Sequence, residues 1–257
     1  MRRIFAIGIG TGSPEQLTEQ AIGALQQVEV VFMLDKGSER ADLTRVRREI
    51  CERYIQRDYR WVELQDGARD PSATYLEGVE RWHEQRTRAY EQAFAEELTE
   101  NGCGAILVWG DPSLYDSTLR ILASIASRAQ VAFEYEVIAG ISSPQVLAAR
   151  HKISLHRVGG AVLITTGRRL LEGFPTGVDD VVVMLDGECA FQKLSEPELE
   201  IYWGAYLGTE HEILRSGPLE RVKDEILRVR SAARAEHGWI MDIYLLRRLL
   251  PQNRSAP

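Results

Sequence analysis

The stretch "GIGTGSPEQLT", residues 8 to 18, follows an apolar run and precedes a helical pattern. Glycines stand at positions 8, 10 and 12, and glycine lets the backbone turn sharply or come close to another group. The residues before them, "RRIFAIGIG", predict a buried strand that ends at these glycines. A glycine-rich turn directly after a buried strand is typical of cofactor-binding loops in α/β proteins.

The spacing of these glycines leaves the cofactor open. A dinucleotide-binding loop has the pattern G-x-G-x-x-G with an acidic residue about twenty positions later. Here the pattern is G-x-G-x-G with Ser13 next, although Asp35 follows a second strand and could take the place of the ribose-binding acid. The loop alone is compatible with a nicotinamide cofactor, with another cofactor, or with a plain structural turn.

Composition limits the function. The chain has 257 residues, 44% of them hydrophobic, and a formal net charge of −7, which argues against nucleic acid as a partner. It has no apolar run of membrane-spanning length, and the N-terminus predicts a strand rather than a signal peptide, so we expect no membrane partner and a cytoplasmic location. Cys51, Cys103 and Cys189 lie far apart without a CxxC pair. We therefore predict buried thiols, with no disulfide and no metal site.

Strand and helix patterns alternate along the chain. In the first part, strands such as "EVVFML" and "GAILVWG" are apolar throughout, and the helix patterns "PEQLTEQAIGALQQ" (14–27) and Ser72–Glu100 lie among them. Fully apolar strands alternating with helices predict a parallel sheet covered on both faces. The later strands are predicted at 161–167, 179–185, 199–208 and 239–246. The expected class is α/β with two α/β domains, 1–156 mostly parallel and 157–257 with a mixed sheet.

Two further loops repeat the character of the first. "VWGDPSLYDST" (108–118) and "VIAGISS" (137–143) each place small residues at the end of a predicted strand. In an open α/β sheet, ligands bind beside the carboxyl ends of the strands. Three such loops predict a cleft in which backbone, rather than long side chains, contacts a cofactor.

These three motifs resemble those of the tetrapyrrole (uroporphyrin-III C, corrin and diphthine) methylases. The family's first motif, G-x-G-P-G-D-P-x-x-L-T, is similar to "GIGTGSPEQLT", with Thr11 and Ser13 as departures. Its G-G-D-P motif is similar to "WGDP", and its P-G-[IV]-[ST]-[SA] motif to "AGISS". The segment 56–100 and the ending "HGWIMDIYLLRRLL" resemble one branch of the family, in the aerobic cobalamin pathway. That branch methylates precorrin-5 at C1 and releases the acetyl group as acetate, giving precorrin-6A.

The resemblance implies S-adenosyl-L-methionine as the methyl donor, held in a trough between the two domains, with S-adenosyl-L-homocysteine as its product. It also implies a tetrapyrrole substrate, and it allows a homodimer, which is usual in the family. The residues it assigns to the cofactor are Thr11, Gly110, Asp111, Tyr115, Ser142, Ser143, Met184, Leu185, Ala205, Gly208, Trp239 and Ile240.

Further residues follow from the expected chemistry. Removal of an acetyl group needs water delivered by a general base, and Asp35 at the end of its predicted strand is the preferred candidate, with His156, Asp186 and Glu210 as alternatives. The carboxylates of the macrocycle need cations, and Arg40 and Arg168 are the predicted substrate-binding arginines. Two other functions stay open: methylation of a different tetrapyrrole carbon or substrate, and a binding module without catalysis.

Overall fold

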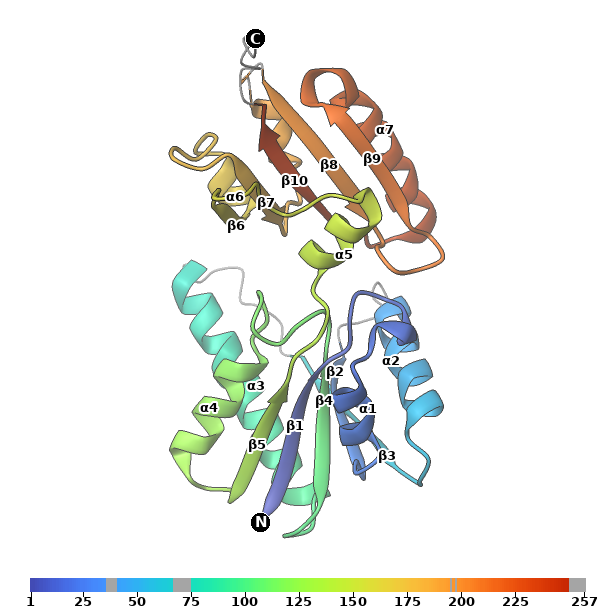
Figure 1. Cartoon of the computed structure of the whole chain (residues 1–257). Coiled ribbons are helices and arrows are strands. Elements are labelled where there is room, and N and C mark those ends of the chain that lie inside the picture. Colours follow the sequence, from blue (N-terminus) through green and yellow to red (C-terminus); the bar gives the residue numbers. More distant parts are fainter. Residues whose placement is uncertain (36–40, 67–74, 195, 197, 250–257) are drawn as a thin grey trace. The chain divides into compact units, whose positions relative to one another are not determined.

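The computed structural model of the chain describes residues 1–35, 41–66, 75–194, 196 and 198–249. It divides into two compact units, Met1–Ser142 and Ser143–Pro257. Each unit has its own five-stranded sheet and its own helices (Figure 1). The predicted α/β class with two sheets is confirmed.

The first unit is built on a parallel sheet of order β3-β2-β4-β1-β5. Apolar residues fill its central strands, as a sheet buried on both faces requires. Its strands are β1 (Arg2–Gly8), β2 (Val30–Asp35), β3 (Arg60–Gln65), β4 (Cys103–Val108) and β5 (Phe133–Ile138). Its helices are η1 (Pro14–Gln16), α1 (Glu19–Leu25), α2 (Ala41–Tyr54), α3 (Tyr75–Glu97) and α4 (Thr118–Arg128).

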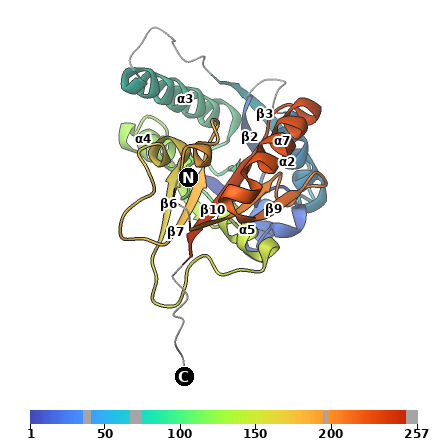
Figure 2. The same ribbon diagram turned by 90° about the horizontal axis from the view of Figure 1, so that it is seen from above.

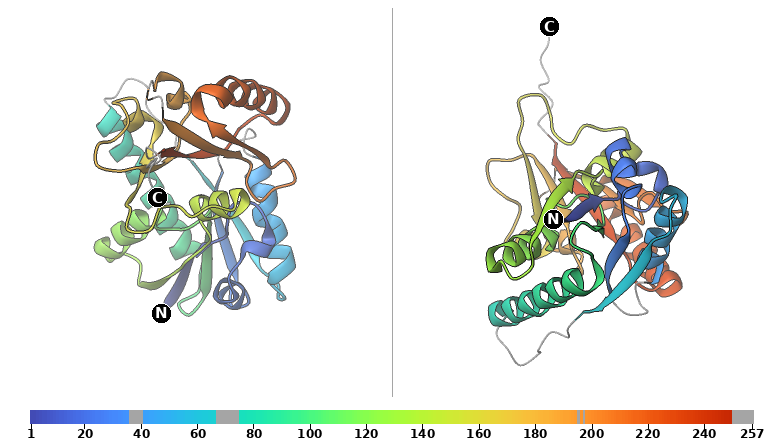
Figure 3. Two further views of the ribbon diagram at one scale, coloured as in Figure 1. Left: turned by 45° about the horizontal axis from the view of Figure 1, so that its top comes forward. Right: turned by 90° about the horizontal axis from the view of Figure 1, so that it is seen from below.

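Helices cover both faces of this sheet, as predicted. Alternate residues of β1 face opposite ways: Phe5 and Ile7 pack with α1 and α2, whereas Ile4 and Ala6 pack with α3 and α4. Figure 3 shows α3 and α4 along one face of the strands and α1 and α2 along the other. This arrangement leaves the carboxyl ends of the parallel strands at one common edge.

β5 differs from the buried central strands of this sheet. Its four residues from Glu134 to Val137 are all exposed. β5 is an edge strand that pairs only with β1, so its outer positions face solvent. Charged residues on an edge strand also discourage pairing with another chain.

The predicted helix 14–27 is divided in two. Ser13 caps the short η1 by accepting the amide of Glu15, and Thr18 caps α1 by accepting the amide of Ala21 at 3.1 Å. Gln16 does not complete a capping box with Ser13, because its side chain accepts the amide of Thr11 instead. The glutamine is thus used to hold the glycine-rich loop.

The predicted long helix is present as α3. Its described part runs from Tyr75, and the predicted start at Ser72 falls on residues 67–74, which lie outside the described part of the chain. Arg86 of α3 is buried. This is possible because Asp66 accepts a hydrogen bond from its Nε at 2.7 Å and the centre of the Trp82 ring lies 3.3 Å from its guanidinium carbon.

The second unit holds a mixed sheet of order β6-β7-β10-β8-β9, as predicted. β6 and β7 are parallel, and the remaining pairs are antiparallel. The sequence did not predict β9, whose residues are partly exposed along its whole length. The elements are α5 (Ser143–His151), β6 (Val162–Thr166), α6 (Gly167–Leu170), β7 (Asp180–Met184), η3 (Ala190–Lys193), β8 (Leu199–Ala205), β9 (Ile213–Pro218), α7 (Leu219–His237) and β10 (Asp242–Arg248).

The second sheet is also covered on both faces. α6, η3 and α7 pack on the side of Val181, Val183 and Trp203, and Figure 2 shows α7 lying along the strands. α5 packs through Val146 and Leu147 on the opposite side. The expected division of the chain lies at 156/157, whereas the compact units divide before α5, since this helix packs on β8, β9 and β10.

The three cysteines are buried and free, as predicted. Burial raises the pKa of Cys51 to about 12 and the pKa values of Cys103 and Cys189 to about 11. In the part of the chain that the structure describes, none of the helices combines the length and apolar character of a membrane span.

Gly23 offers a test of the helix assignment. It lies inside α1, and a Cβ added there meets nothing within 4 Å. Gly23→Ala should raise the free energy of unfolding by roughly 0.5–1 kcal/mol, because alanine loses less backbone entropy in a helix. Urea unfolding followed by circular dichroism measures the change, and a loss of stability would contradict the assignment of this segment as helix.

Candidate functional site

The three glycine-containing loops of the first unit meet at one point. The amide of Gly110 donates to the carbonyl of Gly10 at 2.7 Å, and the amide of Gly10 donates back at 3.3 Å. A Cβ built on Gly140 would lie 2.6 Å from the carbonyl carbon of Gly8 and closer still to the carbonyl oxygen of Gly110. Ser142 lies at the same place, since a Cβ built on Gly110 would be 3.8 Å from the Cα of Ser142.

Asp111 fixes the second loop to the third. Its Oδ1 accepts the amide of Ser113 at 2.8 Å and the hydroxyl of Ser113, and its Oδ2 accepts the amide of Gly140 at 2.9 Å. Burial disfavours the charge on this carboxyl, but the three hydrogen bonds outweigh burial and lower the pKa of Asp111. The carboxylate therefore has a structural role in the turn and also places a negative charge at the loops.

Thr11 is enclosed within the first loop. Its amide donates to Oε1 of Gln16 at 2.6 Å, and its hydroxyl contacts the same oxygen at 3.1 Å. Only 3% of the residue is exposed. The side chain of Gln16 therefore holds this loop in its shape.

Three other predicted residues of this group differ in exposure. Tyr115 is 46% exposed and has a φ of +52°, in the left-handed region that few non-glycine residues adopt. Ser142 is buried, and Ser143 begins α5 as a half-buried residue. Tyr115 is therefore presented to solvent by the turn, whereas Ser142 is held within the loops.

The predicted residues of the second unit gather at one edge of its sheet. β6, β7 and β8 run in the same direction, and β10 runs against them. The carboxyl ends of β7 and β8 therefore lie beside the start of β10. Met184 ends β7 and Leu185 follows it, the segment 205–208 begins with the last residue of β8, and Trp239 and Ile240 precede β10. Distant parts of the sequence meet here.

The residues at this edge are held in defined conformations. Leu185 has a φ of +54° and is 67% exposed. Ala205 is enclosed in the core, and neither its side chain nor its backbone is exposed. The amide of Gly208 donates to Oε2 of Glu212 at 2.8 Å, and the amide of Tyr206 donates to the carbonyl of Met241 at 2.9 Å.

The last predicted pair is divided between surface and core. Trp239 is 42% exposed, whereas Ile240 is buried in the same cluster as Trp203. The backbone of residues 239–241 follows Gly238, whose φ of +78° ends α7. The exposed ring of Trp239 and the exposed side chain of Leu185 are thus the large apolar groups at this edge.

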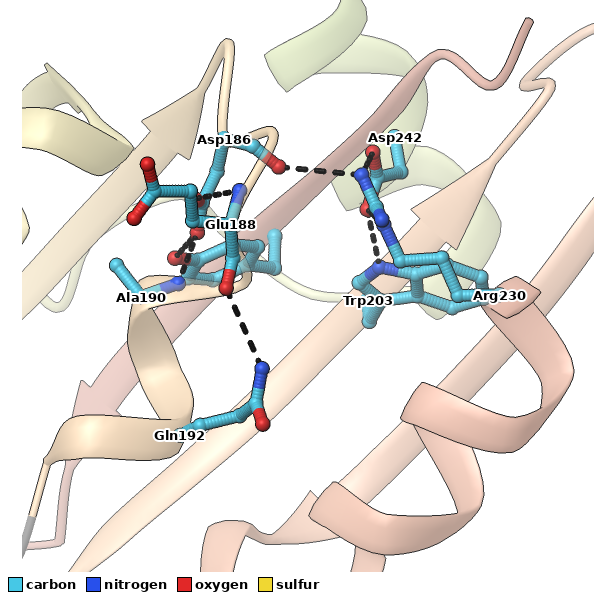
Figure 4. Close-up of polar contacts among 8 residues, drawn as sticks. Asp186, Glu188, Ala190, Gln192, Trp203, Arg230 and Asp242 are labelled. Atoms are coloured by element: carbon cyan, nitrogen blue, oxygen red, sulfur yellow. Dashed lines mark hydrogen bonds and ion pairs between the residues drawn. The ribbon is translucent and has the colours of Figure 1, made fainter. Parts of the chain in front are cut away.

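A buried polar network supports the turn after β7 (Figure 4). Oδ2 of Asp186 accepts the amide of Ala190 at 2.6 Å and the hydroxyl of Tyr244 at 2.5 Å, and Oδ1 accepts the amide of Glu188 at 3.2 Å. A Cβ on Gly167 would lie 2.6 Å from the Cβ of Asp186. Burial raises the pKa of Tyr244, and the charge of Asp186 raises it further.

An ion pair joins this network to α7. Nε of Arg230 donates to Oδ2 of Asp242 at 2.8 Å, and its Nη2 donates to the backbone carbonyl of Asp186 at 3.2 Å. The indole of Trp203 donates to the same Asp242 oxygen at 3.0 Å. Burial disfavours the charge of Arg230, but the bonds to Asp242 outweigh it and raise the pKa of this guanidinium. Asp186 is therefore a structural acid rather than an available base.

The remaining candidates are placed as follows. Asp35 is the last residue of β2, at the same edge as the glycine loops, and Arg40 lies outside the described residues. Arg168 is exposed in the first turn of α6. His156 is an exposed connector residue whose Nδ1 lies 2.8 Å from the carbonyl oxygen of Arg157, and Glu210 is exposed.

Comparisons with known proteins identify the family. The family model described as Tetrapyrrole (Corrin/Porphyrin) Methylases matches residues 3–223. The chain belongs to the tetrapyrrole methylase family. Its motifs at residues 8–18, 108–118 and 137–143 are therefore those of a methylase, and the dinucleotide reading of the first loop does not hold.

Individual relatives are similar over nearly the whole chain. A precorrin-6A synthase (deacetylating) from Sinorhizobium sp is 54% identical over 250 residues, 96% of each chain. The crystal structure of a cobalamin synthesis related protein from Corynebacterium diphtheriae has a TM-score of 0.85 and 40% identity, and the match covers 97% of this chain and 100% of that one.

A more distant structure supports the fold alone. The uroporphyrin-III C-methyl transferase of Thermus thermophilus, solved in complex with S-adenyl homocysteine, has a TM-score of 0.54 and 18% identity. The match covers 95% of this chain and 91% of that one. The α/β architecture is thus shared at an identity too low to transfer individual residues.

The contact between the three methylase loops predicts a strong effect of Gly140→Ala. The added Cβ would strike the backbone of Gly8 and Gly110, which cannot move aside as a flexible side chain would. We expect a loss of about 1–3 kcal/mol in the free energy of unfolding and weaker binding of S-adenosylhomocysteine. Urea unfolding and calorimetry measure both quantities. Gly23→Ala is the matched control, and wild-type stability in Gly140→Ala would contradict the packing.

The network behind Leu185 predicts a cost for Tyr244→Phe. The change leaves Oδ2 of Asp186 with the amide of Ala190 as its remaining donor in a buried place. We expect a loss of about 1–3 kcal/mol in the free energy of unfolding, measured in urea. Tyr202→Phe, which removes a hydroxyl bonded to the half-buried Glu200, should cost about 1 kcal/mol or less. Equal losses in the two variants would argue against a special role of the network.

Proposed function

We propose that the chain is an S-adenosylmethionine-dependent methyltransferase that converts precorrin-5 into precorrin-6A, with release of acetate. The observation that carries this proposal is the 54% identity to a deacetylating precorrin-6A synthase over 96% of both chains. The meeting of the three loops at Gly10, Gly110 and Gly140 supports it, because the family's motifs then form one surface rather than three separate turns.

The residues at the loops fit this cofactor. Gly10 and Gly110 have φ angles of +76° and +69°, and a Cβ on Gly110 meets only the Cα of Ser142 within 4 Å. The amides of Gly10 and Gly110 bond to each other's carbonyls, and a carbonyl oxygen can accept a second hydrogen bond, which suits the hydroxyl and amino donors of a nucleoside. The ionised carboxylate of Asp111 supplies the negative charge that complements a sulfonium cation. S-adenosylmethionine supplies an electrophilic methyl group when it is bound.

In the proposed reaction, one water is consumed for each acetate released. The water adds to the carbonyl carbon of the acetyl group, and the bond from that carbon to C1 of the macrocycle breaks. The electron pair stays on the ring carbon, which then takes the methyl group. A base that accepts the proton of the water would speed the first step, and we propose Asp35 for this role because β2 ends there.

The contribution of the chain to methyl transfer is mainly alignment. Displacement at a methyl group needs the nucleophile in line with the sulfur–carbon bond and water excluded, more than it needs a strong acid or base. We propose that Thr11, Gly110, Asp111 and Ser142 hold the cofactor from the first unit. From the second unit we propose Ser143, Met184, Leu185, Ala205, Gly208, Trp239 and Ile240, with Tyr115 as a further contact and Arg168 for the substrate.

Acetate release decides between this reaction and methylation elsewhere on a tetrapyrrole. With precorrin-5 and methyl-labelled S-adenosylmethionine, we expect one acetate and one labelled macrocycle per turnover, measured by NMR. Labelled product without acetate would replace this substrate with another ring position. Absence of S-adenosylhomocysteine binding at millimolar concentration in calorimetry would remove methyl transfer altogether and leave a binding module.

Asp35→Asn tests the proposed base. We expect the kcat for acetate release to fall by roughly 10²–10⁴-fold, the usual contribution of a general base, while the Kd for S-adenosylhomocysteine stays within twofold. Asp58→Asn is the control, because Asp58 is an exposed acid in the connection before β3. Unchanged kcat in Asp35→Asn would assign the base to another group without affecting the proposed overall reaction.

A further inference from the structure

The first sheet opens at the carboxyl ends of β2 and β4. The two strands pair only as far as Phe32 and Ile106, whereas β2 continues beside β3 to Asp35 and β4 continues beside β1 to Val108. The carbonyl of Val108 accepts the amide of Ile9 on the β1 side. Because successive carbonyls of a strand point to opposite sides, the carbonyl of Leu107 faces the side from which β2 has departed.

The side chain of Arg47 fills this opening. From α2, its Nε donates to the carbonyl of Leu107 at 3.0 Å and its Nη1 donates to the carbonyl of Leu43 at 2.9 Å. The ring of Trp109 lies 5.8 Å from the guanidinium carbon. Among the described residues, no acceptor receives a hydrogen bond from Nη2 of Arg47. This nitrogen is also not fully shielded from solvent. This nitrogen is thus available to a ligand.

Among the described residues, Arg47 differs from the other enclosed arginines in having no acidic partner within 4.0 Å. Arg86 pairs with Asp66, Arg230 with Asp242, and Arg247 with Asp180. No carboxylate of the described residues lies within 4.0 Å of the Arg47 guanidinium; Asp116 acts on it only from a greater distance. Burial lowers the pKa of Arg47, and the negative charge of Asp116 opposes that shift without cancelling it.

An enclosed cation without a counter-charge is costly for a folded protein. Two backbone carbonyls and an aromatic face reduce that cost, but they supply no negative charge. An incoming carboxylate would provide the missing charge and a charge-assisted hydrogen bond from the planar guanidinium. The place is therefore built to receive an anion.

The position of Arg47 separates it from the glycine loops. Leu107 and Trp109 lie within three residues before Gly110, but Arg47 approaches β4 from the β2 side. Gly8 and Gly140 contact Gly110 from the β1 and β5 side. A ligand that rests on the glycine loops and a carboxylate that reaches Arg47 would thus occupy opposite sides of the same strand end.

We infer that Arg47 binds a side-chain carboxylate of the tetrapyrrole substrate, and this inference rests on the proposed function. It adds a substrate-binding arginine that the sequence did not single out. In this role Arg47 fixes the macrocycle relative to β4, because its other two nitrogens are already anchored to the backbone of β4 and α2. Such a residue affects substrate affinity and leaves the cofactor's own contacts unchanged.

Arg47→Gln tests the inference against Arg48→Gln. Arg48 is the neighbouring residue on α2, exposed and paired with Glu63 at 3.0 Å. For Arg47→Gln we expect the KM for precorrin-5 to rise roughly 10- to 100-fold, as for the loss of a charge-assisted bond. The salt dependence of KM should weaken as well. Arg48→Gln should stay within twofold of the wild type in both quantities.

Two further measurements separate binding from folding. The Kd of Arg47→Gln for S-adenosylhomocysteine should stay within threefold of the wild type, which shows that the loops of the first unit are intact. Arg47→Lys keeps the charge and should recover part of the lost affinity for the substrate. If Arg47→Gln does not fold, the KM of Arg47→Lys is compared with the wild type instead. A larger effect on cofactor Kd than on substrate KM would overturn the assignment to the substrate, and unchanged KM in a folded variant would overturn the inference.

Failure of the proposed function can be recognised independently. If the wild type does not convert precorrin-5, the proposed reaction fails, and equilibrium binding of the polycarboxylate uroporphyrin III, followed by fluorescence, then tests Arg47. Weaker binding by Arg47→Gln than by Arg48→Gln would still support a carboxylate site. Equal binding by both variants would overturn it.

Discussion

The contact on which the first unit depends joins backbone to backbone at Gly8, Gly110 and Gly140. Their strands, β1, β4 and β5, are neighbours in the sheet, so their carboxyl ends are brought together by strand pairing. The backbone segments at these strand ends approach so closely that no Cβ fits at Gly8 or Gly140. The amide of Gly140 then bonds to Asp111, which makes the second and third loops a single rigid turn.

In the second unit, polar side chains rather than backbone contacts hold a turn in one conformation. There the turn after β7 is held by Asp186, whose carboxylate accepts two backbone amides and the Tyr244 hydroxyl. Arg230 and Asp242 add an ion pair that ties α7 to the start of β10. Buried polar groups are stable only when each finds its partners, so this network specifies the conformation in which Leu185 is exposed.

The charge of the molecule is organised locally. The net charge of −7 would repel an anionic substrate over a distance, yet Arg47 is enclosed at the end of β4 without an acidic partner among the described residues. An exposed cation in that place would be screened by salt, whereas an enclosed one keeps its strength at close range. In this proposal, the backbone of the glycine loops binds the cofactor, and the charge of Arg47 binds the substrate beside the same end of β4.

The sequence by itself determined the class of fold, the parallel and mixed sheets, the buried cysteines and the family, because apolar periodicity and the short motifs at residues 8–18, 108–118 and 137–143 are local properties. It could not reveal that β5 is an exposed edge, that Gln16 holds Thr11, or that β2 leaves β4 beyond Phe32. Those facts depend on which strands become neighbours. Tertiary structure alone decided that Asp186 is enclosed by Tyr244 and Gly167 and that Arg47 pairs with no acid among the described residues, because partners from distant segments set both environments.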